Sequence, residues 1–208
     1  MQSYLALGDS YTIGEGVVEG ERWPVQLARA LREDGITIAD PRIIAKTGWT
    51  TDELDAAMDA ASPLGEYDFV SLLIGVNNQY RGRDVGNYRE EFAALLERAI
   101  RLAGGRGDRV LVISIPDWGT TRFGNEHAAD KPGRDLAGIS RELDAYNAAA
   151  EAICRSRGVA FVDITPVSRE RGNQASMLAA DGLHPSSRMY AAWTRQARPV
   201  ARALFSTP

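Results

Sequence analysis

Short apolar runs alternate along the chain with longer segments in which apolar residues recur every three or four positions. The runs around Leu72 and Val112 are apolar at consecutive positions, which is typical of strands buried on both faces. This alternation predicts an α/β fold in which helices cover a parallel sheet. The expected strands are Tyr4–Leu7, part of Ile36–Ala45, Phe69–Ile74, Val110–Ile115 and Ala160–Val162.

Helical periodicity and capping signals mark the segments between these strands. Thr50 and Glu53 have the spacing of a capping box, and Trp23-Pro24 places a proline in a first turn. The expected helices lie at Trp23–Glu33, from Thr50 through Ala61, at Tyr88–Leu102, at Ile139–Ile153 and at Tyr190–Leu204. Two segments, Asp117–Asp135 and Thr165–Pro185, have no strong period and are expected to be irregular, and a loop as long as the first is usually functional or mobile.

Length and charge narrow the class of protein further. The 208 residues suit a single domain spanning positions 1–208. The net charge of −4 argues against a nucleic-acid partner, because such proteins normally carry a basic face. No apolar run is long enough to cross a bilayer, and strand-like sequence begins at Ser3, so we expect no signal peptide, no stable membrane insertion and a cytoplasmic location. The single cysteine, Cys154, excludes an internal disulfide and a cysteine-built zinc site.

The first candidate for chemistry is Ser10, in the segment Leu7–Tyr11. It follows the first strand, at the carboxyl edge where open parallel sheets place their active sites. We expect it to be exposed there. On this segment alone, Ser10 is as compatible with a helix-capping serine as with a nucleophile.

A serine nucleophile needs a neutral imidazole as its base and a carboxylate that orients this imidazole. Asp181 and His184 are three residues apart, and one helical turn would place them on the same side. The other histidine, His127, lies in an irregular segment with no strand end nearby. His184 is therefore the better candidate base.

Two further segments offer hydrogen-bond donors for an oxyanion. Asn77 follows the strand that ends near Ile74, and its uncharged amide can donate to a developing negative charge. Gly48 precedes the predicted capping box, where a backbone N–H can face the same cavity with no side chain in the way. Each signal is weak alone.

Together these segments resemble the SGNH (GDSL-type) hydrolases, which carry Ser, Gly, Asn and His in four ordered blocks. The resemblance extends from Leu7 to Pro185. It implies a flavodoxin-like three-layer α/β/α sandwich with a five-stranded parallel sheet, and no cofactor or metal. The site residues that it implies are Ser10 as nucleophile, Asp181 and His184 as its triad partners, and Ser10, Gly48 and Asn77 as oxyanion donors.

The chain departs from the family pattern at two positions. Tyr11 stands where the family often has leucine after the nucleophile, which we expect to change packing or pocket shape rather than chemistry. Asn78 stands where the third block usually has aspartate, which removes a charge beside Asn77.

The resemblance predicts a serine esterase that hydrolyses a small-molecule, short-acyl carboxylic ester through an acyl-enzyme on Ser10. Carbohydrate deacetylases, lysophospholipases, thioesterases and arylesterases share the same blocks, so each of these remains an alternative. A non-catalytic flavodoxin-like module that binds a ligand through the same residues is the alternative from another class. A metal-dependent hydrolase is disfavoured, because two histidines in such different settings give no ligand set. The oligomeric state is not indicated.

Large side chains in the loops at the catalytic edge suggest the shape of the substrate pocket. Tyr80, Trp118 and Phe123 are expected to bind substrate by walling off an acyl pocket. Neither loop offers the continuous apolar surface that a long acyl chain needs, so acetyl to butyryl esters are the expected substrates. The arginines at positions 81, 83 and 122 suggest a polar or anionic alcohol portion at the rim.

Overall fold

The computed structural model describes residues 1–128 and 135–206, and its centre is a five-stranded sheet in which every neighbouring pair of strands is parallel. The strand order is β2-β1-β3-β4-β5, so the first strand is central rather than at an edge. The strands are β1 (Tyr4–Gly8), β2 (Arg42–Ala45), β3 (Phe69–Leu73), β4 (Val110–Ile113) and β5 (Ala160–Val162). The predicted fold class is confirmed, although the sheet takes only the last four residues of Ile36–Ala45.

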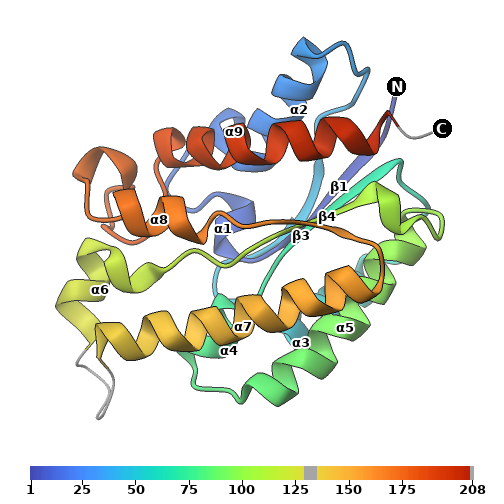
Figure 1. Ribbon diagram of the computed structural model, residues 1–208. Helices are drawn as coiled ribbons and strands as arrows, with labels where there is room; N and C mark the ends of the chain where they lie inside the picture. Colours follow the sequence, from blue (N-terminus) through green and yellow to red (C-terminus); the bar gives the residue numbers. More distant parts are fainter. Residues whose placement is uncertain (129–134, 207–208) are drawn as a thin grey trace.

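Helices cover both faces of this sheet and complete three layers (Figure 1). One face carries α2 (Trp23–Glu33) and α9 (Ser187–Leu204), which pack against each other. The opposite face carries α3 (Thr51–Ala60), α5 (Val85–Leu102) and α7 (Leu136–Ser156). None of the helices in the described residues is both long enough and apolar enough to span a bilayer.

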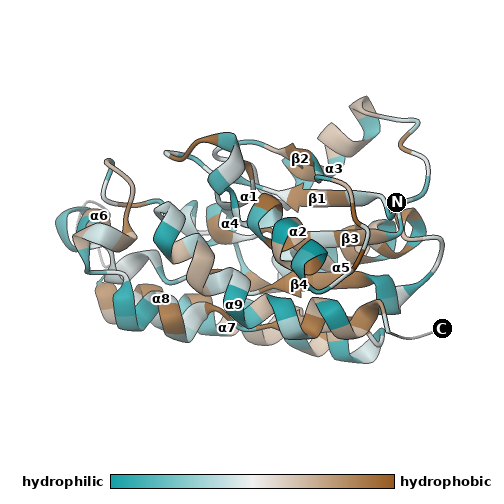
Figure 2. Cartoon of the chain, turned by 90° about the horizontal axis from the view of Figure 1, so that it is seen from above, coloured by the Kyte–Doolittle hydropathy of each residue, from teal (hydrophilic) through white to brown (hydrophobic). Residues whose placement is uncertain are grey.

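Burial on both faces explains the consecutive apolar runs of the central strands. Every residue of β1, β3 and β4 is buried, and Figure 2 shows the strands largely in the hydrophobic colour while the surrounding helices alternate between the two colours. The helices need only one apolar stripe, because only one side of each contacts the sheet.

Most helix boundaries follow from local capping chemistry. The capping box between Thr50 and Glu53 forms as predicted and begins α3. Helix α2 has the predicted bounds, with proline in its first turn. Helix α5 begins before the predicted Tyr88, because the Asp84 side chain accepts hydrogen bonds from the first backbone N–H groups of the helix.

The two segments predicted to be irregular contain short helices, which corrects that expectation. The first holds η3 (Trp118–Thr120) and α6 (Arg122–His127), and the second holds α8 (Thr165–Arg171) and η5 (Ala175–Met177). Each is too short to show an apolar period. Side-chain caps stabilise the first pair: Asp117 accepts from Gly119 N–H at 3.0 Å and Thr121 from Gly124 N–H at 3.0 Å. Residues 129–134 of the first segment lie outside the described residues.

Candidate active site

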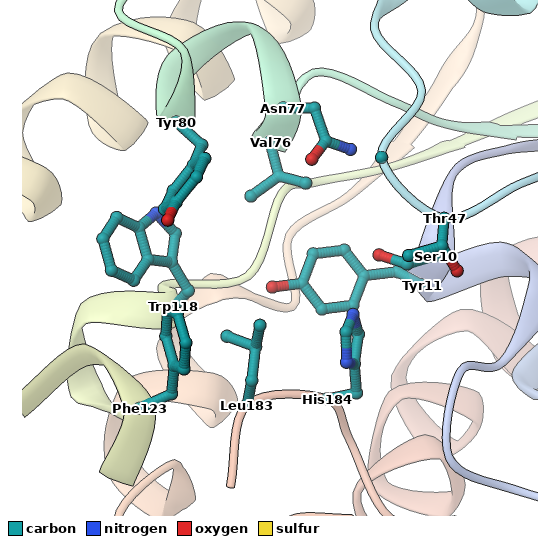
Figure 3. A pocket seen from close by; sticks show the side chains of 11 residues that line it. Ser10, Tyr11, Thr47, Val76, Asn77, Tyr80, Trp118, Phe123, Leu183 and His184 are labelled. Carbon is teal, nitrogen blue, oxygen red and sulfur yellow. The ribbon is translucent and has the colours of Figure 1, made fainter. Parts of the chain in front are cut away.

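A cavity of about 200 Å³ lies at the carboxyl edge of the sheet, where β1 is followed by α1 (Ser10–Ile13) and β3 by α4 (Val76–Tyr80). Ser10, Asn77 and His184 lie toward one end of this pocket, and three aromatic side chains form the other (Figure 3). The structure thus brings most of the predicted site residues to one place. The lining residues are Ser10, Tyr11, Thr47, Gly48, Val76, Asn77, Tyr80, Trp118, Phe123, Leu183 and His184.

Ser10 is the first residue of α1 and lies directly after β1. The side chain of Asp9 caps this helix by accepting a hydrogen bond from the Tyr11 backbone N–H at 3.0 Å. Ser10 is only 4% exposed, so the expectation of an exposed serine is corrected. Ser10 nevertheless lines the pocket.

Asp181 and His184 form a close pair. One carboxylate oxygen of Asp181 lies 2.6 Å from His184 Nδ1, and the other accepts backbone N–H bonds from Leu183 at 2.9 Å and His184 at 3.0 Å. Partial burial acts to raise the pKa of the Asp181 carboxyl, but these hydrogen bonds outweigh it and hold the pKa below its ordinary value. Asp181 is therefore an anion near neutral pH.

The segment that carries this pair is a turn, not the helical turn inferred from the spacing. Gly182 adopts a φ of 72°, a left-handed conformation that glycine adopts without strain. The ends of the turn are held together by an isolated bridge between Leu178 and Pro185 and by a 2.7 Å bond from Ala179 N–H to the His184 carbonyl. The predicted spatial pairing is present, but its geometric reason was wrong.

The imidazole of His184 is 11% exposed and faces the pocket beside Tyr11, whose ring centroid lies 5.8 Å away in an edge-on arrangement. Among the residues that the structure describes, no hydrogen bond joins Ser10 to His184. Both side chains nevertheless line the same cavity.

Gly48 and Asn77 line the same cavity as Ser10, and Figure 3 shows Asn77 across the pocket from His184. Gly48 has a φ of 88°, and its carbonyl accepts a 2.7 Å bond from Arg81. The Asn77 amide nitrogen donates to the Trp49 carbonyl at 2.9 Å. A side-chain amide has two N–H donors, so one is fixed by Trp49 and the other remains for a ligand.

Asn78 links α4 to the beginning of α3. It is fully buried, accepts from the Thr51 backbone N–H at 3.1 Å and donates to the Thr51 hydroxyl at 2.6 Å. The same hydroxyl donates to Glu91, which also lies 3.5 Å from the Asn78 amide nitrogen. The charge missing at position 78 is therefore present close by, on Glu91.

Tyr80, Trp118 and Phe123 line the end of the pocket that lies far from Ser10. The Tyr80 and Trp118 rings pack edge-on at 5.4 Å, and those of Trp118 and Phe123 lie 6.3 Å apart. The indole N–H of Trp118 donates to the Gln79 side chain at 2.8 Å. This bond fixes the orientation of a large side chain at the closed end of the cavity.

The three arginines expected to hold an alcohol portion bind the protein itself, which corrects that expectation. Arg81 bonds the Gly48 carbonyl, Arg83 pairs with Asp52 at 2.6 Å, and Arg122 donates to the Ala180 carbonyl at 3.1 Å. These guanidinium groups hold the loops of the site together. An isolated arginine in a loop sequence does not reveal that its partner is a distant carbonyl or carboxylate.

Some pocket residues were not predicted from the sequence. Thr47, Val76 and Leu183 line the cavity, and each is the immediate neighbour of a predicted residue. Adjacency to a motif residue at a strand end was the available signal. His127 does not line the pocket; it lies on α6 with its ring 4.4 Å from that of Phe123. In residues 1–128 and 135–206, no three His, Cys, Asp or Glu side chains gather as metal ligands.

Comparison with protein families identifies the family of the chain. The model of the GDSL-like lipase/acylhydrolase family matches residues 6–192, which include all four motif blocks. A comparison with curated proteins finds no match.

Solved structures share the fold over nearly the whole chain. TesA superposes with a TM-score of 0.74 at 20% identity, covering 98% of this chain and 99% of its own. The esterase EstA from Pseudoalteromonas sp., inhibited by monoethylphosphonate, gives 0.72 at 15% identity and covers 100% of both chains. A variant of Axe2, an acetyl xylan esterase from Geobacillus stearothermophilus, gives 0.69 at 18% identity, with 96% and 94% covered. At these identities the likeness shows the fold.

Proposed function

Because the chain belongs to the GDSL-like lipase/acylhydrolase family, and is thus a hydrolase of carboxylic esters, we propose that it cleaves short-acyl esters through an acyl-enzyme on Ser10. We assign this activity to a single domain spanning residues 1–208. The observation that carries the proposal is the Asp181–His184 pair, at 2.6 Å, in the same cavity as Ser10.

The pair supplies what a serine nucleophile lacks. The Asp181 carboxylate accepts from Nδ1–H of His184, which leaves Nε2 unprotonated as the base for the Ser10 hydroxyl. In the first half-reaction, Ser10 Oγ bonds the carbonyl carbon and His184 takes its proton. The ester C–O bond then breaks, and the proton passes to the departing alcohol. Catalytic hydrogen bonds often tighten only when substrate is bound, so the lack of a Ser10–His184 bond is compatible with these roles.

The second half-reaction regenerates the serine. A water molecule adds to the acyl carbon and gives a proton to His184, and this proton returns to Ser10 Oγ as the acid departs. In both halves the carbonyl oxygen becomes an oxyanion. We assign its stabilisation to the backbone N–H groups of Ser10 and Gly48 and to the second amide hydrogen of Asn77, where one such donor contributes about 3–4 kcal/mol.

The cavity supports the assignment of a short acyl group. Its volume of about 200 Å³ is below the roughly 300–1,000 Å³ of pockets for drug-sized ligands, and Trp118 and Phe123 close its far end. The preference for short acyl groups was first inferred from a lack of apolar surface in the loops, and the structure gives a different reason for it. The walls near Val76 and Leu183 are apolar, so it is the length of the cavity, not its polarity, that excludes a long chain.

A fluorophosphonate probe tests the proposal, as a phosphonate inhibits the related esterase EstA. We expect the probe to label the wild-type chain once, with the added mass on the tryptic peptide that contains Ser10. Ser10→Ala should not be labelled, although it should unfold at the same temperature. Labelling that persists in Ser10→Ala would disprove the nucleophile. An unlabelled but folded wild-type chain would favour the ligand-binding module.

A further inference from the structure

Tyr11 places a hydroxyl group inside the pocket. It follows Ser10 in α1 and is 3% exposed. Its ring packs edge-on against the rings of His184, at 5.8 Å, and Trp193, at 5.9 Å. In Figure 3 the hydroxyl extends from this packed ring into the cavity, toward the end that is closed by Trp118. The leucine common at this position in the family would offer no polar atom here.

The Tyr11 hydroxyl has no hydrogen-bond partner among the described residues, whereas the backbone N–H of the same residue bonds Asp9. Three other buried tyrosines satisfy their hydroxyl groups, whereas the hydroxyl of Tyr190 is buried without a partner. The three pairs are Tyr4 with Ser71 at 2.9 Å, Tyr88 with the Ile74 carbonyl at 3.2 Å and Tyr146 with the Arg83 carbonyl at 2.6 Å. Because a hydroxyl buried without a partner costs about 1–3 kcal/mol, whatever fills the pocket must bond Tyr11 or bear this cost.

The surroundings of the hydroxyl limit what it can bind. Burial raises the pKa of Tyr11 far above its ordinary value, and the nearby carboxylates of Asp9, Asp117 and Asp181 raise it further, so the group remains a neutral phenol. Asp117 is paired with Arg169 at 2.8 Å, but the negative charge of Asp181 disfavours an anionic ligand in the pocket. The remaining wall is apolar near this hydroxyl, with Val76 on one side. A neutral oxygen atom on an otherwise apolar group fits these conditions.

The enclosed end of the cavity suits the acyl part of the ester. The acyl group stays attached to Ser10 through both half-reactions, whereas the alcohol must leave and be replaced by water. The alcohol side must therefore remain open to solvent, while the acyl side can be closed, as it is here by Trp118 and Phe123.

We propose that Tyr11 is a specificity-determining residue whose hydroxyl bonds a neutral oxygen atom in the acyl chain, so that oxygen-bearing short acyl groups are preferred to alkyl groups of equal size. This inference rests on the proposed esterase function. A site that hydrogen-bonds a substrate group discriminates against the analogue without it, because its own polar group is then left unpaired.

Ethyl methoxyacetate and ethyl butyrate test this preference, since they differ only by an oxygen atom in place of one CH₂ group. We would measure kcat/KM for both esters in the wild type, in Tyr11→Phe and in Tyr11→Leu. The ratio of methoxyacetate to butyrate should fall about three- to tenfold in both variants, the range of one neutral hydrogen bond. The difference in chemical reactivity between the two esters cancels when ratios are compared across variants. In Tyr11→Phe the rate on butyrate should rise, because no hydroxyl is left to desolvate.

Tyr190→Phe is the matched control. The hydroxyl of Tyr190 likewise has no partner, but it is buried away from the pocket, which Tyr190 does not line, so its removal should leave the ratio unchanged. Equal losses on both esters in Tyr11→Phe, or an unchanged ratio, would overturn the inference while leaving the esterase intact. If neither ester is cleaved by the wild type, or if Ser10→Ala still cleaves them, the proposed function itself fails and the inference fails with it.

Discussion

The side chain of Asn78 bonds both the backbone N–H and the hydroxyl group of Thr51, and so joins α4 to the first turn of α3. The neighbouring Asn77 bonds the Trp49 carbonyl in the same loop. Two consecutive asparagines therefore hold the segment that contains Gly48 against α4. The proposed oxyanion donors depend on this connection, because Gly48 and Asn77 lie on its two sides.

The first prediction concerns position 78, where a substitution can restore the carboxylate that the family usually has. Asn78→Asp keeps the acceptor for Thr51 N–H but loses the amide donor and places a negative charge beside Glu91. We expect the free energy of unfolding in urea to fall by roughly 1–3 kcal/mol, with a drop in kcat that exceeds any rise in KM.

Glu91→Gln tests whether repulsion between the new carboxylate at position 78 and Glu91 causes the loss of stability. In the double variant Asn78→Asp/Glu91→Gln the repulsion is removed, so we expect recovery of part of the lost stability, with a coupling energy of about 0.5–3 kcal/mol. Strictly additive effects of the two substitutions would show that Glu91 does not sense the charge at position 78.

The role of Asn78 also shows where reading the sequence reaches its limit. The motif blocks around Ser10 and His184 were predictable, since short blocks at strand ends carry both the residue types and their order. The consequence of having asparagine in place of aspartate at position 78 was not predictable from the sequence. Glu91 is 13 residues away and meets Asn78 only through helix packing.

Secondary structure was likewise predictable where local sequence determines it and was missed where other contacts do. Trp23–Glu33 was predicted with its correct bounds because proline and an apolar stripe define it locally. Helix α6 was missed because the Thr121 side chain caps its first turn and the Gly182 carbonyl accepts from Phe123 N–H at 3.0 Å. The cap is local but the helix is too short to show an apolar period, and the contact with Gly182 joins segments far apart in the chain, so neither leaves a periodic pattern in the sequence.

The second prediction concerns the nucleophile. Ser10→Ala should lower kcat by about 10⁴–10⁶-fold, as the removal of a triad member does elsewhere. The side chain has no hydrogen bond that the structure records and faces the cavity, so the melting temperature should change little. Hydrolysis of p-nitrophenyl acetate and a thermal melt measure the two effects. Retention of a tenth of the wild-type rate would exclude Ser10 as the nucleophile.

The third prediction separates the two histidines. His184→Ala should reduce kcat as severely as Ser10→Ala, because one imidazole serves as base and then as acid. His127→Ala should have a mild effect, since its ring packs on Phe123 outside the cavity. The comparison requires kcat and KM for both variants on one ester. A severe loss in His127→Ala together with a mild one in His184→Ala would refute the Asp181–His184 assignment.

The fourth prediction follows from the buried carboxyl of Asp9. Burial raises its pKa to about 7 in the folded chain, against an ordinary value of 3.8, despite the bond from Tyr11 N–H. A raised pKa means that the folded state holds the proton more tightly than the unfolded state. Its stabilising contribution is thus complete below about pH 4 and is lost as the pH rises through 7.

Asp9→Asn removes this dependence while keeping an oxygen that can accept from Tyr11 N–H. The free energy of unfolding of the variant minus that of the wild type should therefore be larger at pH 8 than at pH 5, by on the order of a few kcal/mol. Urea unfolding of both chains at the two pH values measures this difference. A difference that is the same at pH 5 and pH 8 would show that Asp9 keeps an ordinary pKa.

The last prediction addresses acyl length. If the cavity holds the acyl chain, kcat/KM on p-nitrophenyl esters should be greatest between acetyl and butyryl, and at least tenfold lower for octanoyl. Methylene groups gain about 0.8 kcal/mol each only when they are buried, and Trp118 and Phe123 block burial beyond the cavity.

Trp118→Ala should move the maximum to a longer chain. Tyr80→Ala provides a second opening that need not unfold the protein, because Tyr80 is 39% exposed. Phe161→Ala, on β5 and outside the pocket, should leave the profile unchanged. A wild-type maximum at octanoyl or beyond would mean that the acyl chain leaves the cavity by a route that these aromatic residues do not close.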